Sequence, residues 1–178
     1  TGSPEPPVVG QAAWALANLA ILDEAKAQLH ALSAVSALVD RLEDLTAAHD
    51  PGDGGPAATA MQQIVRCIAN LLVRADCRQA LPARNGAPVI VASAAATPGN
   101  DGLSAAVARS LANFSFDHAA QVVHAGGLPL LIAMLSSGAT QLEHGALGAV
   151  LNISAVTMHI EALIEHGVLG PLTEIQSR

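Results

Sequence analysis

Four asparagines recur at the same point of a repeated apolar segment in this 178-residue chain. Successive members lie 52, 43 and 39 residues apart, and each stands within an apolar-x-Asn-apolar pattern. A side-chain amide both donates and accepts hydrogen bonds, so a row of amides suits the main chain of an extended peptide. The alternative is structural, with each amide bonded to the backbone of a neighbouring helix. The four residues are Asn18, Asn70, Asn113 and Asn152.

Further polar and aromatic side chains stand one helical turn before these asparagines, at position i−4. Trp14, Arg66 and Arg109 hold this position in three segments, and Gly148 holds it in the fourth. One turn earlier still, the last segment has His144. Arginine pairs bidentately with carboxylate and phosphate, so the two arginines indicate an acidic or phosphorylated ligand. The alternatives are that the arginines are solvated and that the tryptophan packs against apolar neighbours.

Patterns typical of catalysis or metal binding are weak. The seven histidines show no metal-ligand spacing, and His159-x-Glu161 is a two-residue match that is more typical of a solvated helix face. Cys67 follows Arg66, which can lower the pKa of a thiol, but its place in the apolar pattern favours the core. The sequence contains no nucleophile elbow and no phosphate-binding glycine loop. We therefore expect no catalytic residue, no metal site and no cofactor.

A second landmark follows each asparagine by about 15 residues and consists of a small residue and an apolar run. Its last three glycines, Gly86, Gly127 and Gly167, lie 41 and 40 residues apart. Two landmarks thus keep a common period of about 40 residues, which indicates internal repeats. The longer 52-residue interval contains a loop insertion at 47–56, rich in glycine, proline and aspartate.

Each repeat is predicted to contain three helices. A short first helix ends at glycine, and a second helix carries the apolar run with a proline in or near its first turn. A third helix carries the asparagine, with apolar residues at helical spacing. The apolar fraction is 51% but only 2% of residues are aromatic, which suits closely packed helices and disfavours a β-sandwich. The fold class is therefore predicted to be all-α.

This organisation resembles the armadillo repeat of importin alpha and beta-catenin. Residues 12–19 are close to the consensus third helix, and residues 124–131 are typical of the corner between the first and second helices. The resemblance implies a right-handed α-solenoid of about four repeats, with third helices lining a concave face that holds an extended partner segment. In importin alpha a tryptophan at i−4 sandwiches lysine stems. Here only Trp14 matches, and Arg66 and Arg109 replace it, which argues against a basic nuclear-localisation ligand.

The repeat boundaries follow from the two landmarks. We expect a tail at 1–8, either flexible or an expression remnant, and an armadillo domain at 9–178. Because the pattern opens on a third helix and closes after a second helix, we expect part of a longer array, or ends that self-associate. The predicted units are a leading third helix at 9–21, repeats at about 22–74, 75–115 and 116–155, and a partial repeat at 156–178.

Charge and composition restrict the partners and the compartment. The net charge is −7, yet residues 60–110 carry +3 while residues 1–59 and 111–178 carry −6 and −4. An acidic chain does not suit general nucleic-acid binding, and no apolar run approaches the roughly 18 residues of a membrane span. Two cysteines give no disulfide framework, which indicates a reducing, intracellular compartment. We expect the cytoplasm, with the cytoskeleton or nucleus as alternatives.

We therefore expect a non-enzymatic scaffold or adaptor that binds an extended, acidic partner segment on its concave face. One alternative is a structural building block that stacks in a cytoskeletal or axonemal assembly. Another is a regulatory armadillo domain of a larger protein. The predicted peptide-binding residues are Trp14, Asn18, Arg66, Asn70, Arg109, Asn113, His144 and Asn152.

Overall fold

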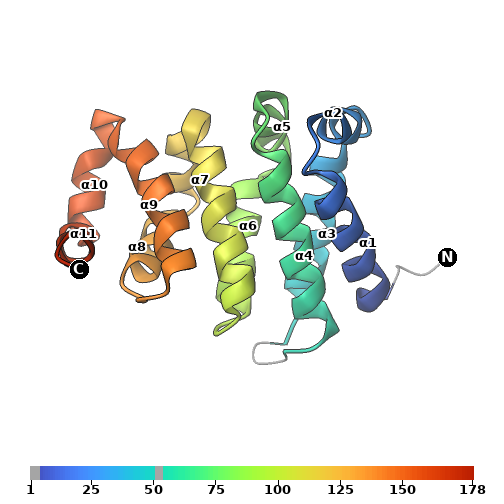
Figure 1. Ribbon diagram of the computed structural model, residues 1–178, viewed down its shortest axis with the longest axis horizontal. Coiled ribbons are helices and arrows are strands. Elements are labelled where there is room, and N and C mark those ends of the chain that lie inside the picture. Colours follow the sequence, from blue (N-terminus) through green and yellow to red (C-terminus); the bar gives the residue numbers. More distant parts are fainter. Residues whose placement is uncertain (1–4, 51–53) are drawn as a thin grey trace.

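The computed structural model describes residues 5–50 and 54–178, and these ranges contain eleven α-helices, two short 3-10 helices and no strand. The helices follow one another along an elongated array from α1 to α11 (Figure 1). The predicted all-α solenoid is therefore confirmed.

The third helices of successive repeats pack against one another in chain order and form one face of the array, called the third-helix face below. Each carries one of the four asparagines near its C-terminal end, which places these residues at equivalent positions. The third helices are α1 (Pro6–Leu19), α4 (Pro56–Leu71), the first part of α7 (Asp101–His124) and α9 (Thr140–Ser154).

The first helices are short. They comprise α2 (Asp23–Ala31), α5 (Ala75–Ala80) with η1 (Pro82–Arg84), the last part of α7, and η2 (Thr157–His159) with α10 (Ile160–Glu165). The second helices pack behind the third helices. They are α3 (Ala34–Ala48), α6 (Gly86–Ala96), α8 (Gly127–Leu135) and α11 (Leu169–Gln176).

A left-handed residue ends the first helix in every repeat. Gly126 and Gly167 take this conformation at φ 75° and 85°, while Ser33 and Asn85 take it at φ 57° and 52°. Glycine and asparagine tolerate this region best, so three of the four corners use the favoured residue types. The following Gly127 has a different role. A Cβ there would lie 2.9 Å from the carbonyl oxygen of Val122, so the close approach of the two helices needs glycine.

A single residue makes the turn from the third helix of one repeat to the first helix of the next within α7. His118 has φ −132° and ψ 41°, outside the helical region, and helical geometry continues on both sides. Its imidazole ring stacks on the ring of Phe114, with 4.7 Å between centroids. Phe114 is fully buried, so the stack holds the kink against the core.

A continuous core of small and aliphatic side chains runs along the array. Small residues allow the third helices to approach closely: a Cβ on Gly145 of α9 would lie 2.7 Å from the Cβ of Ala108 of α7. Within the described ranges no single helix is long and apolar enough to cross a membrane. Two pairs of consecutive helices reach that length and apolarity together, but they are bent by 114° and 116°.

Two predicted loop segments lie partly outside the described residues. Of the expected tail at 1–8, residues 1–4 are not described, and α1 already begins at Pro6. Of the expected insertion at 47–56, residues 51–53 are not described. Helix α3 continues to Ala48, and α4 begins at Pro56, where a missing N–H costs no helical hydrogen bond.

Candidate functional site

The four repeated asparagines, Asn18, Asn70, Asn113 and Asn152, are called the ladder asparagines below. The last three bind the backbone of the preceding third helix. Nδ2 of Asn70 donates to the carbonyl of Ala17 at 2.8 Å, and Nδ2 of Asn113 donates to the carbonyl of Ala69 at 2.9 Å. Both acceptors lie in the last turn of their helix, where carbonyls lack an intrahelical partner. Each asparagine therefore caps the end of the neighbouring repeat's third helix.

The third interface follows the same pattern with one addition. Nδ2 of Asn152 donates to the carbonyl of Ala112 at 2.9 Å and also lies 3.2 Å from the hydroxyl of Ser115. In all three interfaces the accepting residue directly precedes the ladder asparagine of the earlier repeat. The amide N–H groups thus join the repeats, as the structural alternative from the sequence anticipates.

The amide oxygens hold the two arginines. Nη2 of Arg66 donates to Oδ1 of Asn18 at 2.8 Å, and Nη2 of Arg109 donates to Oδ1 of Asn70 at 3.0 Å. Each guanidinium therefore reaches back across one repeat boundary to a ladder asparagine. At the third boundary Gly148 takes the arginine's position, and among the described residues no hydrogen bond to Oδ1 of Asn113 is found.

These two arginines differ from every other cation of the described chain. Within that part of the chain Arg66 and Arg109 make no ion pair, although both lie on the third-helix face. The pKa of Arg109 is lowered, first by its partial burial and second by the neighbouring positive charge of Arg66. Guanidinium groups stay protonated in proteins, so both positive charges persist. The six cations that do pair with acids are Lys26, Arg41, Arg74, Arg78, Arg84 and Arg178.

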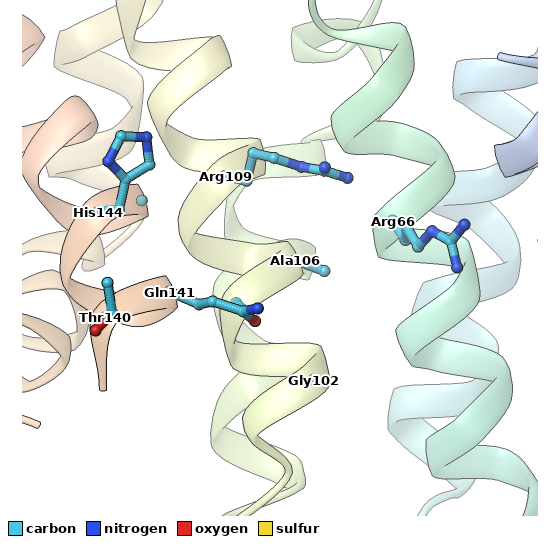
Figure 2. A pocket seen from close by; sticks show the side chains of 9 residues that line it. Arg66, Gly102, Ala106, Arg109, Thr140, Gln141 and His144 are labelled. Atoms are coloured by element: carbon cyan, nitrogen blue, oxygen red, sulfur yellow. The ribbon is translucent and has the colours of Figure 1, made fainter. Parts of the chain in front are cut away.

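A cavity of about 480 Å³ lies between the third helices α4, α7 and α9. Figure 2 shows Arg109 extending from α7 towards α4, Arg66 on α4 with its guanidinium pointing away from Arg109, and His144 and Gln141 on the α9 side. Small residues make up most of the remaining lining: Gly102, Ala105, Ala106 and Gly145. The cavity brings together three of the predicted site residues, Arg66, Arg109 and His144.

A second cavity, of about 390 Å³, adjoins the first because Arg66 lines both. Trp14 lies in its wall, 54% exposed, beside Pro6 and Pro7. Gln63 also lines it and accepts a long 3.4 Å hydrogen bond from Nη1 of Arg66. An aromatic, proline-rich surface therefore continues directly into the cationic one.

The cysteines are not suited to nucleophilic chemistry. Cys67 and Cys77 are both fully buried. Burial raises the pKa of the Cys67 thiol to about 12, against a smaller opposing effect of Arg66. Burial, and then the charge of Asp76, raise the pKa of the Cys77 thiol to about 11. At neutral pH neither residue offers a useful amount of thiolate.

Comparison with known proteins agrees with this organisation. Residues 115–155 match the family model for the armadillo/beta-catenin-like repeat. An engineered protein from the Northeast Structural Genomics Consortium is similar to the chain with a TM-score of 0.83 and 25% identity, over 99% of this chain and 70% of that one. The match to one repeat, and the fold shared along the whole array, make the chain similar to armadillo-repeat proteins.

Designed armadillo proteins are among the similar structures. One has a TM-score of 0.80 and 22% identity, over 97% of this chain and 70% of its own. Another, solved in complex with the peptide (KR)4, has a TM-score of 0.77 and 21% identity, over 98% of this chain and 75% of its own. The comparison with curated proteins gave no match.

Proposed function

We propose that this chain is a non-enzymatic interaction scaffold whose third-helix face binds an extended partner segment bearing carboxylate or phosphate groups. The observation that carries the proposal is the pair of cations on this face, Arg66 and Arg109, which have no acidic partner among the described residues. An acidic segment would supply the negative charge that pairs with these two arginines.

The hydrogen bonds to asparagine support this role because they orient the guanidinium groups before a ligand arrives. Each arginine has five N–H donors. The bond to Asn18 or Asn70 uses one of them, and Arg66 gives a second to Gln63. The remaining donors can form a bidentate pair with a carboxylate or phosphate. Fixing a long side chain in advance also lowers the entropy cost of binding. Asn18 and Asn70 thus act as positioning residues for the arginines.

The charge of the face distinguishes this chain from the designed neighbour solved with (KR)4, whose peptide is basic. Two arginines on the corresponding surface would repel such a peptide, so we expect the opposite ligand charge here. The cavity beside Trp14 adds a preference for an apolar residue next to the acidic ones. The segment we expect therefore combines acidic groups with an apolar side chain a few residues away.

The test is a binding titration with three synthetic peptides of one length, in which acidic positions carry glutamate, glutamine or lysine. Trp14 is the only tryptophan and the chain has no tyrosine. The fluorescence emission of Trp14 therefore reports on the third-helix face, where it lines the second cavity. We expect binding of the glutamate peptide alone, weakened by salt. Equal binding of the glutamine peptide would show that the face does not select acidic residues.

The matched variants separate local recognition from overall charge. Arg66→Glu with Arg109→Glu should weaken binding of the glutamate peptide by about a hundredfold or more, since each charged hydrogen bond contributes about 1.5–3 kcal/mol. Arg84→Glu with Arg178→Glu changes the net charge equally at side chains that pair with acids elsewhere. Binding should survive in this control. Equal loss in both double variants would refute the assignment to the third-helix face.

Stacking in a larger assembly is the second candidate, and exposed apolar side chains near the last helices favour it. Leu151, Met158 and Leu169 are 70%, 77% and 57% exposed. Sedimentation across a concentration series distinguishes the two. A monomer at all concentrations would contradict stacking of this chain on itself, and ordered self-association would favour it.

A further inference from the structure

Three side chains with metal-binding atoms meet on the first helices of two consecutive repeats, α2 and α5, at the top of Figure 1. They are His30 in the last turn of α2 and Asp76 and Cys77 in the first turn of α5. An imidazole nitrogen, a carboxylate oxygen and the thiol sulfur all lie within 4.8 Å of one another. None of these residues belongs to the third-helix face.

We propose that His30, Asp76 and Cys77 form a binding site for a zinc-like divalent cation, with water as the fourth ligand. Nitrogen, oxygen and sulfur are the donors that Zn²⁺ takes in proteins, at about 2.0–2.3 Å in tetrahedral geometry. Ligand atoms around such an ion lie roughly 3–4 Å apart, so the three side chains need to close by about 1 Å. This is within the reach of rotamer adjustment.

The three residues differ in how far they are exposed to solvent, which leaves one side of the cluster open to an ion. Cys77 is fully buried, whereas His30 and Asp76 are half-buried. An ion can therefore enter between the imidazole and the carboxylate and meet the sulfur beneath them. Once bound, it would be shielded on the sulfur side and open to water on the other, which leaves room for the fourth ligand.

Two of the three ligands bind a metal ion in their deprotonated form, the carboxylate of Asp76 and the thiolate of Cys77. At neutral pH a carboxylate is already ionised, whereas a thiol carries its proton. Binding therefore replaces the S–H bond by an S–metal bond and releases one proton to solvent for each ion bound.

Arg74 is the competitor for this site. Its Nε and Nη2 donate to Oδ1 and Oδ2 of Asp76 at 3.0 and 2.6 Å. Oδ1 also accepts the backbone N–H of Cys77 at 2.8 Å, so both its lone pairs are used. Oδ2 keeps one lone pair for an ion. The positive charge of Arg74 opposes a cation, so its removal should strengthen binding.

The experiment uses the full chain, reduced and freed of metal, titrated with Zn²⁺ and with Co²⁺ as a spectroscopic probe. We expect one ion per chain, one proton released, and a thiolate-to-Co²⁺ charge-transfer band. Cys77→Ser and His30→Ala should both lose the band, while Cys67→Ser, which changes the other buried cysteine, should keep it. Arg74→Ala should bind Zn²⁺ more tightly, on the order of tenfold.

Thermal denaturation without metal shows whether each variant is folded. If Cys77→Ser does not fold, His30→Ala provides the test of the site. A Co²⁺ complex without a thiolate band, or a band that persists in His30→Ala, would overturn the proposal. Equal Zn²⁺ affinity in Arg74→Ala and the unchanged chain would do so as well. These outcomes are independent of peptide binding at the third-helix face.

Discussion

Replacing Arg78 by alanine should lower the free energy of unfolding by about 3 kcal/mol, because this side chain joins two repeats from a nearly buried position. Its Nε donates to Oδ2 of Asp117 at 2.5 Å, and the two side chains are only 11% and 28% exposed. Its Nη1 donates to the carbonyls of Leu72 and Val73, at 3.0 and 2.8 Å, just beyond the end of α4. The guanidinium also lies 5.4 Å from the ring centroid of Phe116.

The magnitude follows from what the substitution leaves behind. Removing one partner of a buried ion pair costs about 3–5 kcal/mol, since the other charge stays desolvated. Asp117 is partly exposed, so the lower end of this range applies. Arg84 provides the matched control, because it also pairs across a repeat boundary, with Asp40 at 2.8 Å, but both side chains are about half exposed. Such pairs contribute about 0–1 kcal/mol.

Urea unfolding followed by far-ultraviolet circular dichroism measures both variants, and the emission of Trp14 adds a probe located in α1. We expect a large decrease in stability for Arg78→Ala and a small one for Arg84→Ala. If the two losses agree within about 0.5 kcal/mol, the reasoning from burial is wrong.

Three further predictions rest on other features. Gly145→Ala should lose about 1–3 kcal/mol of stability, because its Cβ would lie 2.7 Å from that of Ala108, whereas Gly170→Ala has no atom within 4 Å and should be neutral or stabilising in urea melts. Since Arg74 lowers the folded-state pKa of Asp76 to about 2, this carboxylate stabilises the fold above its ordinary pKa of 3.8. Stability should therefore fall as pH drops from 3.8 towards 2, and less so in Asp76→Asn. Both cysteines should resist alkylation at pH 8 until urea unfolds the chain; rapid labelling of the native protein would contradict their burial.

The repeat organisation could be predicted from the sequence because it depends on local patterns. Asparagines and glycines at a period of about 40 residues lie in the third helices and at or next to the corners. The corner before α6 shows the limit of such patterns. The left-handed residue there is Asn85, and Gly86 is the first residue of the helix, because asparagine tolerates that region too.

The contacts between repeats could not be predicted, because they depend on how far each side chain reaches. Spacing places Arg66 and Asn70 on one face, but it does not reveal that each arginine bonds the asparagine of the preceding repeat. The cluster of His30 with Asp76 and Cys77 is a further case. A separation of 46 residues gives no metal-ligand signature, and only the stacking of α2 near α5 brings the ligands together. The peptide-binding role of the eight predicted residues stays a prediction.

The hydrogen bonds between third helices all run the same way along the array. In every case the donor belongs to the later repeat and the acceptor to the earlier one, for the asparagine amides and for the arginines alike. The two directions along this face are therefore not equivalent, because donors and acceptors follow one another in a fixed order. A partner segment of reversed sequence would present the same composition but meet different donors and acceptors at each step, so it is not an equivalent ligand.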